Sequence, residues 1–300
     1  MKTTRYLARR TAGSLTLALL MTAAAGSAWG GQSLDIPSKT WGISFGNSKS
    51  FTGLRFNFRD SQVQRVNGLN LTLWQPRKDN KDAVIQGLSF GTLPGGGYLR
   101  GIQLGILGVS AEKELKGISL GLLGAGCGGD VVGLTAGGLG AGCGGSITGL
   151  NLGGLGIGAG KDVTGTTIGG PGAGAGGSMK GVNIGGVGVG AGERLTGLTL
   201  GGLAAGAPEV RGITIGGLAV GGNDVKGIQI AGGFIMINKG GRLAGLAASS
   251  FNYIRGAQTG LAVGIVNYAY SVKGLQIGLV NIVRDNPRGL KVLPVFNTSF

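Results

Sequence analysis

A glycine recurs at an almost constant interval along most of this 300-residue chain. From Gly101 to Gly197 the interval is always 16 residues, and elsewhere it runs from 14 to 19 residues. Self-similarity at a fixed period is the signature of stacked repeats, each of which buries its apolar face against its neighbours. The sequence therefore predicts a repeat protein. The sixteen glycines, each followed by an apolar residue except at Gly165, are Gly53, Gly68, Gly87, Gly101, Gly117, Gly133, Gly149, Gly165, Gly181, Gly197, Gly212, Gly227, Gly245, Gly260, Gly274 and Gly289.

The apolar spacing within one repeat favours short strands. In the repeat that begins at Ile147, Leu150 and Leu152 lie two residues apart, which is the period of one strand face. Leu155 and Ile157 form a second such pair, three residues further on. A glycine doublet separates the pairs, and because glycine readily adopts positive φ, we expect the chain to turn there and point both pairs at one interior. We predict an all-β fold, a β-solenoid of about sixteen coils of roughly 14–19 residues with irregular capping repeats.

The remaining positions of the repeat complete this interpretation. A lone apolar residue flanked by charges, as in Glu114-Leu115-Lys116, is expected to point inward. A polar residue between the first two apolar residues is expected to point outward. A helix is disfavoured because each glycine costs it about 1 kcal/mol relative to alanine. The polar row consists of Gln103, Ser119, Thr135, Asn151, Thr167, Asn183, Thr199, Thr214 and Gln229.

The alternative architecture is an outer-membrane-type β-barrel of about sixteen strands, which would be an integral membrane protein and could form a pore. Residues 54–59 alternate apolar and polar side chains without a break, as the strands of such barrels do. An unbroken strand in the central repeats, however, would point Leu139 and Leu155 into the lumen. The step of three residues between the apolar pairs therefore favours the solenoid.

Residues 1–30 have the pattern of a secretory signal peptide. Four basic residues precede residue 11, an apolar stretch covers residues 12–25, and small residues follow. Cleavage after Ala28 and cleavage after Gly30 both fit. We expect export to the cell envelope or cell surface, either at the outer membrane or outside the cell. Residues 31–98 hold irregular N-terminal repeats, residues 99–230 the regular glycine-rich array and residues 231–300 irregular C-terminal repeats.

Composition limits the chemistry that this chain can perform. It has 69 glycines but only 7 prolines and no Gly-X-Y triplet, which excludes collagen. It has no histidine, the commonest general base and metal ligand. Residues 158–161 only weakly resemble a phosphate-binding loop, and no metal-binding pattern stands out. We therefore expect no enzyme activity, no cofactor, no metal and no nucleotide or specific nucleic-acid ligand.

The net charge is +15 for the whole chain, and removal of the signal peptide leaves 23 basic against 12 acidic residues, or +11. Such a charge attracts anionic surfaces, so an anionic envelope surface or glycan is the expected partner, with the outer membrane as another. The sequence does not fix the oligomeric state. The residues expected to contact that surface are Arg77, Lys78, Lys81, Lys116, Lys180, Arg211, Lys226, Lys273 and Arg288. The last six directly precede a repeat glycine, and we expect them to form one row at a corner of the coils.

The cysteines Cys127 and Cys143 are separated by the length of one repeat. Equivalent positions on stacked coils have Cα atoms roughly 5 Å apart, which is within the disulfide range. Because export leads to an oxidising compartment, we expect a disulfide between neighbouring coils.

Residues 274–281, Gly-Leu-Gln-Ile-Gly-Leu-Val-Asn, and the glycine-rich arrays resemble an uncharacterised family of exported bacterial surface-repeat proteins. The resemblance covers nearly all of the chain after the signal peptide. It implies a place in the cell envelope or on the cell surface, and it carries no catalytic residues. Together with the repeats, it suggests a structural or adhesive rod that makes multivalent contacts.

Overall fold

The computed structural model of the chain describes residues 33–299. These residues fall into two compact units, unit 1 within Met1–Leu122 and unit 2 within Leu123–Phe300. The expected signal peptide and both candidate cleavage sites lie outside the described residues. Within the described part, no helix is long and apolar enough to cross a membrane.

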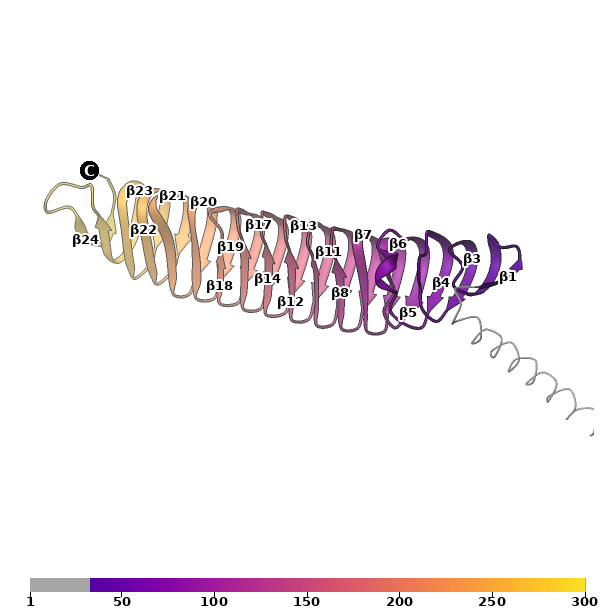
Figure 1. Ribbon diagram of the computed structural model, residues 1–300. Coiled ribbons are helices and arrows are strands. Elements are labelled where there is room, and N and C mark those ends of the chain that lie inside the picture. The colour runs from indigo at the N-terminus through magenta and orange to yellow at the C-terminus, as the bar shows by residue number, and fades with distance from the viewer. Residues whose placement is uncertain (1–32, 300) are drawn as a thin grey trace, which may run out of the picture. The chain divides into compact units, whose positions relative to one another are not determined.

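In its described part, unit 1 holds seven strands and one short 3-10 helix, and Figure 1 labels most of the strands. Its strands are β1 (Ser33–Pro37), β2 (Trp41–Gly46), β3 (Ser50–Asn57), β4 (Arg65–Thr72), β5 (Val84–Gly91), β6 (Gly95–Gly105) and β7 (Gly108–Gly121), and η1 (Lys78–Asn80) follows β4. The strands from β2 to β7 pair parallel, each with the next, whereas β1 runs antiparallel to β2.

In unit 2, each regular coil contributes one longer and one shorter strand, and from β20 onward the strands are longer and continuous. The strands are β8 (Gly124–Cys127), β9 (Asp130–Gly137), β10 (Gly140–Cys143), β11 (Ile147–Gly153), β12 (Gly156–Ala159), β13 (Val163–Gly169), β14 (Gly172–Ala175), β15 (Met179–Gly185), β16 (Gly188–Ala191), β17 (Arg194–Gly201), β18 (Ala204–Gly206), β19 (Glu209–Gly216), β20 (Ala219–Ala231), β21 (Phe234–Ala248), β22 (Phe251–Val263), β23 (Val266–Val283) and β24 (Val292–Asn297).

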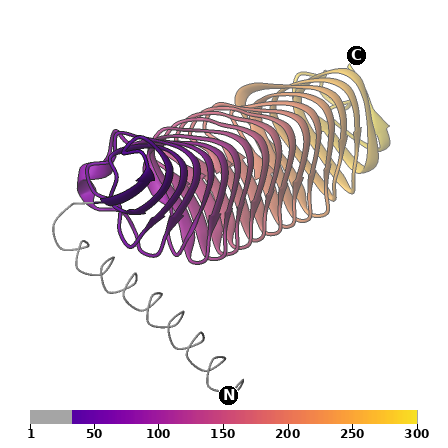
Figure 2. The same ribbon diagram turned by 90° about the vertical axis from the view of Figure 1, so that its right-hand side faces the viewer.

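Every regular strand pairs parallel and in register with its equivalent in the next coil. Strand β11 lies between β9 and β13, so that Gly149 faces Gly133 on one side and Gly165 on the other. Strand β12 lies in the same way between β10 and β14. Figure 2 shows the coils of unit 2 as successive turns of one winding chain. The fold is a β-solenoid of about 14 turns, which confirms the predicted fold class.

The alternative barrel is wrong, because its neighbouring strands would have to run antiparallel. Antiparallel pairing occurs only at the end strands of the described chain, between β1 and β2 and between β23 and β24. The structure has about 14 turns against the expected sixteen or so, and the glycine at position 289 does not belong to the stack. It lies in the turn between β23 and β24. The end strands cover the open edges of the sheet, which is the role expected of caps.

The glycine that defines each repeat lies within the longer strand of its coil, and the stack requires it to be glycine. We call it the corner glycine. Gly149 has a φ of 125°, which L-residues with a side chain rarely adopt. A Cβ built there would lie 2.0 Å from the Gly133 carbonyl oxygen in the preceding coil. The glycine that defines the repeat therefore lies where consecutive coils approach too closely for a side chain.

The interior was predicted correctly at two positions and wrongly at four. Ile147 and Ile157 point inward, with 1% and 5% of their surface exposed. Asn151, expected outside, is 0% exposed, whereas Leu150 and Leu152 are 38% and 37% exposed. Leu155, expected inside, is 61% exposed. The whole polar row is buried: Gln103, Ser119, Thr135, Asn151, Thr167, Asn183, Thr199, Thr214 and Gln229.

The width of the interior explains this inversion. Strand alternation runs without a slip from Ile147 through Gly149 to Asn151, so these three residues share one side. A Cβ at Gly153 would lie 2.2 Å from the Gly156 carbonyl oxygen and 2.8 Å from Ile157 Cγ1. The inward side of β11 thus has space for the side chains of Ile147 and Asn151 only. The leucines lie on the opposite side of the same strand, which faces out.

Some of the buried polar side chains in each unit form hydrogen bonds with one another, whereas others, such as Gln103 and Asn183, have side-chain atoms without a hydrogen-bond partner among the described residues. In unit 1, the fully buried Arg55 donates to Asp60 Oδ1 (2.5 Å) and to Asn70 Oδ1 (2.7 Å). In unit 2, Asn252 donates to Asn267 Oδ1 (2.7 Å), and Asn267 donates to Asn281 Oδ1 (2.8 Å). Such side-chain ladders follow from parallel register, since identical residues repeat at each turn.

The corner glycine gives a direct test of the stacking. We expect Gly149→Ala to destabilise the chain by about 2–3 kcal/mol. The alanine would have to adopt a positive φ, and its Cβ would clash with the Gly133 carbonyl oxygen. Gly158→Ala is the matched control, since a Cβ there meets no atom within 4 Å, and its effect should stay within about 0.5 kcal/mol. Thermal unfolding of the mature chain measures both. Equal midpoints for the two variants would contradict the stacking argument.

Candidate functional site

The inversion places two rows of aliphatic side chains on the outside of unit 2. Leu150 and Leu152 are the outward residues one and three positions after the corner glycine, and the register repeats them from coil to coil. Contiguous apolar surface of this kind marks an interaction site more often than scattered exposed residues do. We call the two rows the apolar face. Its members are Leu134, Ala136, Leu150, Leu152, Thr166, Ile168, Val182, Ile184, Leu198, Leu200, Ile213, Ile215, Ile228, Ile230, Leu246, Ala248, Leu261, Val263, Leu275 and Ile277.

A third apolar row lies at the turn that follows each longer strand. Leu155 N donates to the Leu139 carbonyl oxygen (2.5 Å), and Leu203 N donates to that of Val187 (2.7 Å), so these residues follow one another along the stack. The large exposed side chains of this row widen the apolar surface beyond the sheet. They are Leu123, Leu139, Leu155, Val187, Leu203, Leu218, Ile265 and Leu279.

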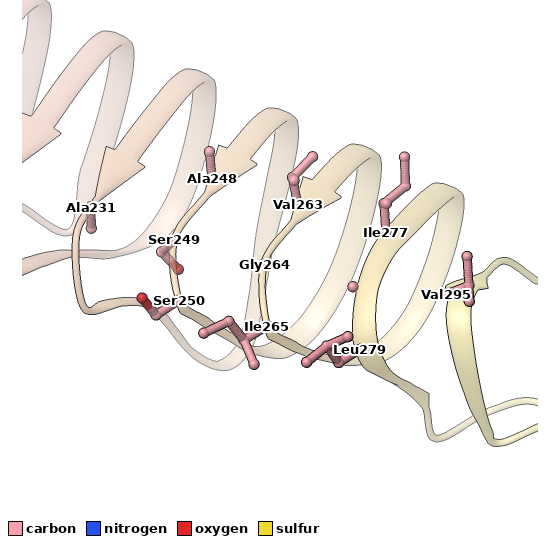
Figure 3. Close-up of a pocket in the computed structure, with 11 residues that line it drawn as sticks. Ala231, Ala248, Ser249, Ser250, Val263, Gly264, Ile265, Ile277, Leu279 and Val295 are labelled. Carbon is pink, nitrogen blue, oxygen red and sulfur yellow. The ribbon is translucent and has the colours of Figure 1, made fainter.

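Near the C-terminal end of unit 2, a groove of about 640 Å³ lies between the apolar face and this turn row. Figure 3 shows Val263 and Ile277 on one side of the bend and Ile265 and Leu279 on the other. The groove forms where Ala248 replaces the bulkier Ile230 of the preceding coil. Of the residues that line it, only two serines carry a polar side chain.

A row of basic residues runs along one edge of the apolar face. Each occupies the outward position just before the corner glycine, two residues from the first aliphatic row. Lys180, Arg211 and Lys226 follow one another there with Thr196 between the first two. In the same row, Ala244 and Thr259 separate Lys226 from Lys273. In unit 1, the equivalent position holds Lys116, paired in register with Arg100. The fold thus brings together four of the predicted contact residues in unit 2, which we call the basic row.

Carboxylates balance part of the basic row. Glu209 forms ion pairs with Arg194 and Arg211, and hydrogen bonds from these guanidinium groups, that of Arg194 foremost, lower the pKa of its carboxyl. Asp224 lies 3.8 Å from Lys226. Within residues 33–299, Lys180 and Lys273 form no ion pair. Their charges are therefore available to an external anion.

The other predicted contact residues lie elsewhere. Arg77, Lys78 and Lys81 are exposed around η1 in unit 1, interspersed with Asp79 and Asp82. The carboxylate of Asp82 accepts a hydrogen bond from Lys113 (2.5 Å), which lowers its pKa. This loop is therefore not a purely basic surface.

Arg288 was expected in the same corner row as Lys273, and that placement is wrong. The parallel stack ends at β23, so Arg288 lies in the exposed turn before β24. Sequence reasoning also missed the apolar face, because it assigned the leucines to the interior. The unbroken alternation from Ile147 to Asn151 was the signal that could have shown it.

The cysteines occupy matching positions in neighbouring strands. Cys127 of β8 and Cys143 of β10 are register partners, and Ala159 of β12 follows in the same row. Cys127 Sγ donates to the Asp130 carbonyl oxygen (3.4 Å). Burial raises the pKa of the Cys143 thiol to about 11, with the neighbouring Cys127 as the second cause. The register that a disulfide needs is present, and the bond itself stays a prediction.

In the part of the chain that the structure describes, no three residues of the types His, Cys, Asp and Glu cluster as a metal site would require. Comparison with protein-family models, with curated proteins and with solved structures found no match.

The cysteine pair can be tested in exported material. We expect the unreduced protein to be lighter than the reduced protein by two hydrogen atoms, because adjacent strands lie about 4.8 Å apart. Mass spectrometry of the intact chain measures this difference. It should vanish in Cys143→Ala, a change that the fold accommodates because Ala159 fills the same row. Alkylation of both thiols without prior reduction, in the unfolded wild-type chain, would refute the disulfide.

Proposed function

We propose that this chain is an exported, non-catalytic repeat protein of the cell envelope or cell surface, and that it adheres to an anionic surface or partner. Its contacts would be individually weak and repeated from coil to coil. Linked contacts of this kind add through effective concentration, so a modest affinity at each coil gives firm attachment. The signal-like N-terminus and the resemblance to exported surface-repeat proteins support the location.

The observation that carries this proposal is the pairing of the apolar face with the basic row along its edge. Both follow the same register, in which every coil adds to the apolar face and some coils add a basic residue at its edge. A surface with a repeated composition suits an extended partner better than a single small ligand. The exposed lysines Lys180 and Lys273 favour a partner of negative charge.

The lack of catalysis is part of the proposal. Most of the largest fully buried side chains are apolar, and the buried Arg55 is held by hydrogen bonds to Asp60 and Asn70. The outward positions repeat a few side-chain types and converge on no single point. An active site requires the opposite, several different polar groups around one reacting atom.

Cell fractionation tests this function. We expect the chain in the envelope fraction or on the cell surface, cleaved after Ala28 or Gly30, and open to protease added outside or after the outer layer is permeabilised. A salt wash should release part of it, because screening weakens the attraction of exposed charges. A variant that lacks residues 1–30 is the control and should stay in the cytoplasm. A full-length, cytoplasmic wild-type chain would overturn the proposal.

A further inference from the structure

We propose that the apolar face of unit 2 lies on an anionic phospholipid bilayer, with the aliphatic side chains at the level of the upper acyl chains and the basic row among the headgroups. This inference rests on the proposed function and names the surface to which the protein adheres.

The size of the apolar face requires a cover. Ten coils at about 4.8 Å per rung make the face about 45 Å long, and its two rows plus the turn row make it roughly 12–15 Å wide. The product, on the order of 600 Å², is as large as the largest apolar patch of an ordinary soluble monomer, and such patches are commonly functional. The side chains are aliphatic over nearly the whole length, with Thr166 as a polar exception.

The charges beside the face identify the cover. Proteins that lie in a membrane interface place apolar side chains against the acyl boundary and Lys or Arg beside them, where anionic headgroups attract them. The basic row stands in that relation to the apolar face, two residues along each strand. The carboxylates Glu209 and Asp224 lie two residues before the basic row along the strand, on the side away from the apolar face. In the same outer row, Asp162 Oδ1 accepts a hydrogen bond from Ser178 N (2.7 Å). Arg211 and Lys226 are paired with carboxylates of that outer row, whereas Lys180 and Lys273 keep the edge of the face positive.

The groove at the C-terminal end of the face fits the same partner. It is a shallow, open depression, and its walls are aliphatic, with Val263 and Ile277 opposite Ile265 and Leu279. A bilayer that covers the face also presents acyl chains to this groove.

A second copy of the chain matches the charges less well. Two copies with their apolar faces in contact would each bring a mature charge of +11 to the complex, so the charges of the two copies repel each other. The observations therefore favour an anionic lipid surface, and self-association becomes an outcome of the test.

Flotation of the mature full-length chain with lipid vesicles tests the proposal. One set of vesicles is phosphatidylcholine alone, and in the other about one lipid in three is phosphatidylglycerol. We expect binding at least about tenfold stronger to the anionic vesicles, and weaker binding at high salt.

Two variants separate the apolar from the charged contribution. The quadruple change Leu150→Thr, Leu198→Thr, Ile213→Thr and Ile228→Thr should weaken binding at least about tenfold, and Thr166 shows that this row accepts threonine. Lys180→Gln with Lys273→Gln should weaken binding to the anionic vesicles and leave binding to phosphatidylcholine unchanged. Arg288→Gln, outside the basic row, is the matched control and should bind as the wild type does.

The proposal is overturned if the chain does not float, if it binds both vesicle types equally, or if neither variant differs from the control. It is also overturned if sedimentation shows a dimer that the quadruple change dissociates, since the face would then cover a second copy. Circular dichroism checks that the variants fold, and if the quadruple variant does not, the lysine pair decides. A negative result here leaves the fractionation test intact, because an exported chain could adhere through another surface.

Discussion

Close contact between the backbones of consecutive coils is the constraint on which this structure depends. At each turn of the stack, the corner glycine lies directly against the glycine of the preceding coil, at a distance that no side chain permits. This contact sets the parallel register, since a shift by one residue would place a Cβ against a carbonyl oxygen. Register in turn aligns each kind of side chain into a row along the stack. The apolar face and the basic row are therefore consequences of the glycines.

The same compactness explains why the chain exposes so many aliphatic residues. An interior bounded by Gly149 and Gly153 has room for one aliphatic and one small polar side chain per longer strand, and the shorter strand adds Ile157. The remaining aliphatic residues lie on the outer side of the sheet, whose neighbouring strands are held in register. A wider coil would have buried them and left an ordinary polar surface. Here a narrow core and an extended apolar face arise from one geometry, and the basic row gives that face a charged edge.

Much of the fold could be predicted from the sequence, because a fixed period requires equivalent units that stack. The inward positions of Ile147 and Ile157 followed from the pattern. The orientation of Leu150 and Asn151 did not, because the rule that apolar residues lie inside competes with strand alternation, and only the width of the interior decides between them. The row of Lys180 and Arg211 was predictable from its fixed offset to the glycine. Arg288 shares that offset and still lies outside the row, because sequence alone does not show where stacking ends.

The most direct test of the narrow core is the accessibility of a single cysteine to a thiol reagent in two variants, Asn151→Cys and Leu150→Cys. Both are made in a chain whose two native cysteines are replaced by alanine. The account predicts that a maleimide labels Leu150→Cys rapidly in the folded protein, whereas Asn151→Cys reacts only after unfolding. The reverse order would contradict it, because it would place the leucines in the core and remove the apolar face.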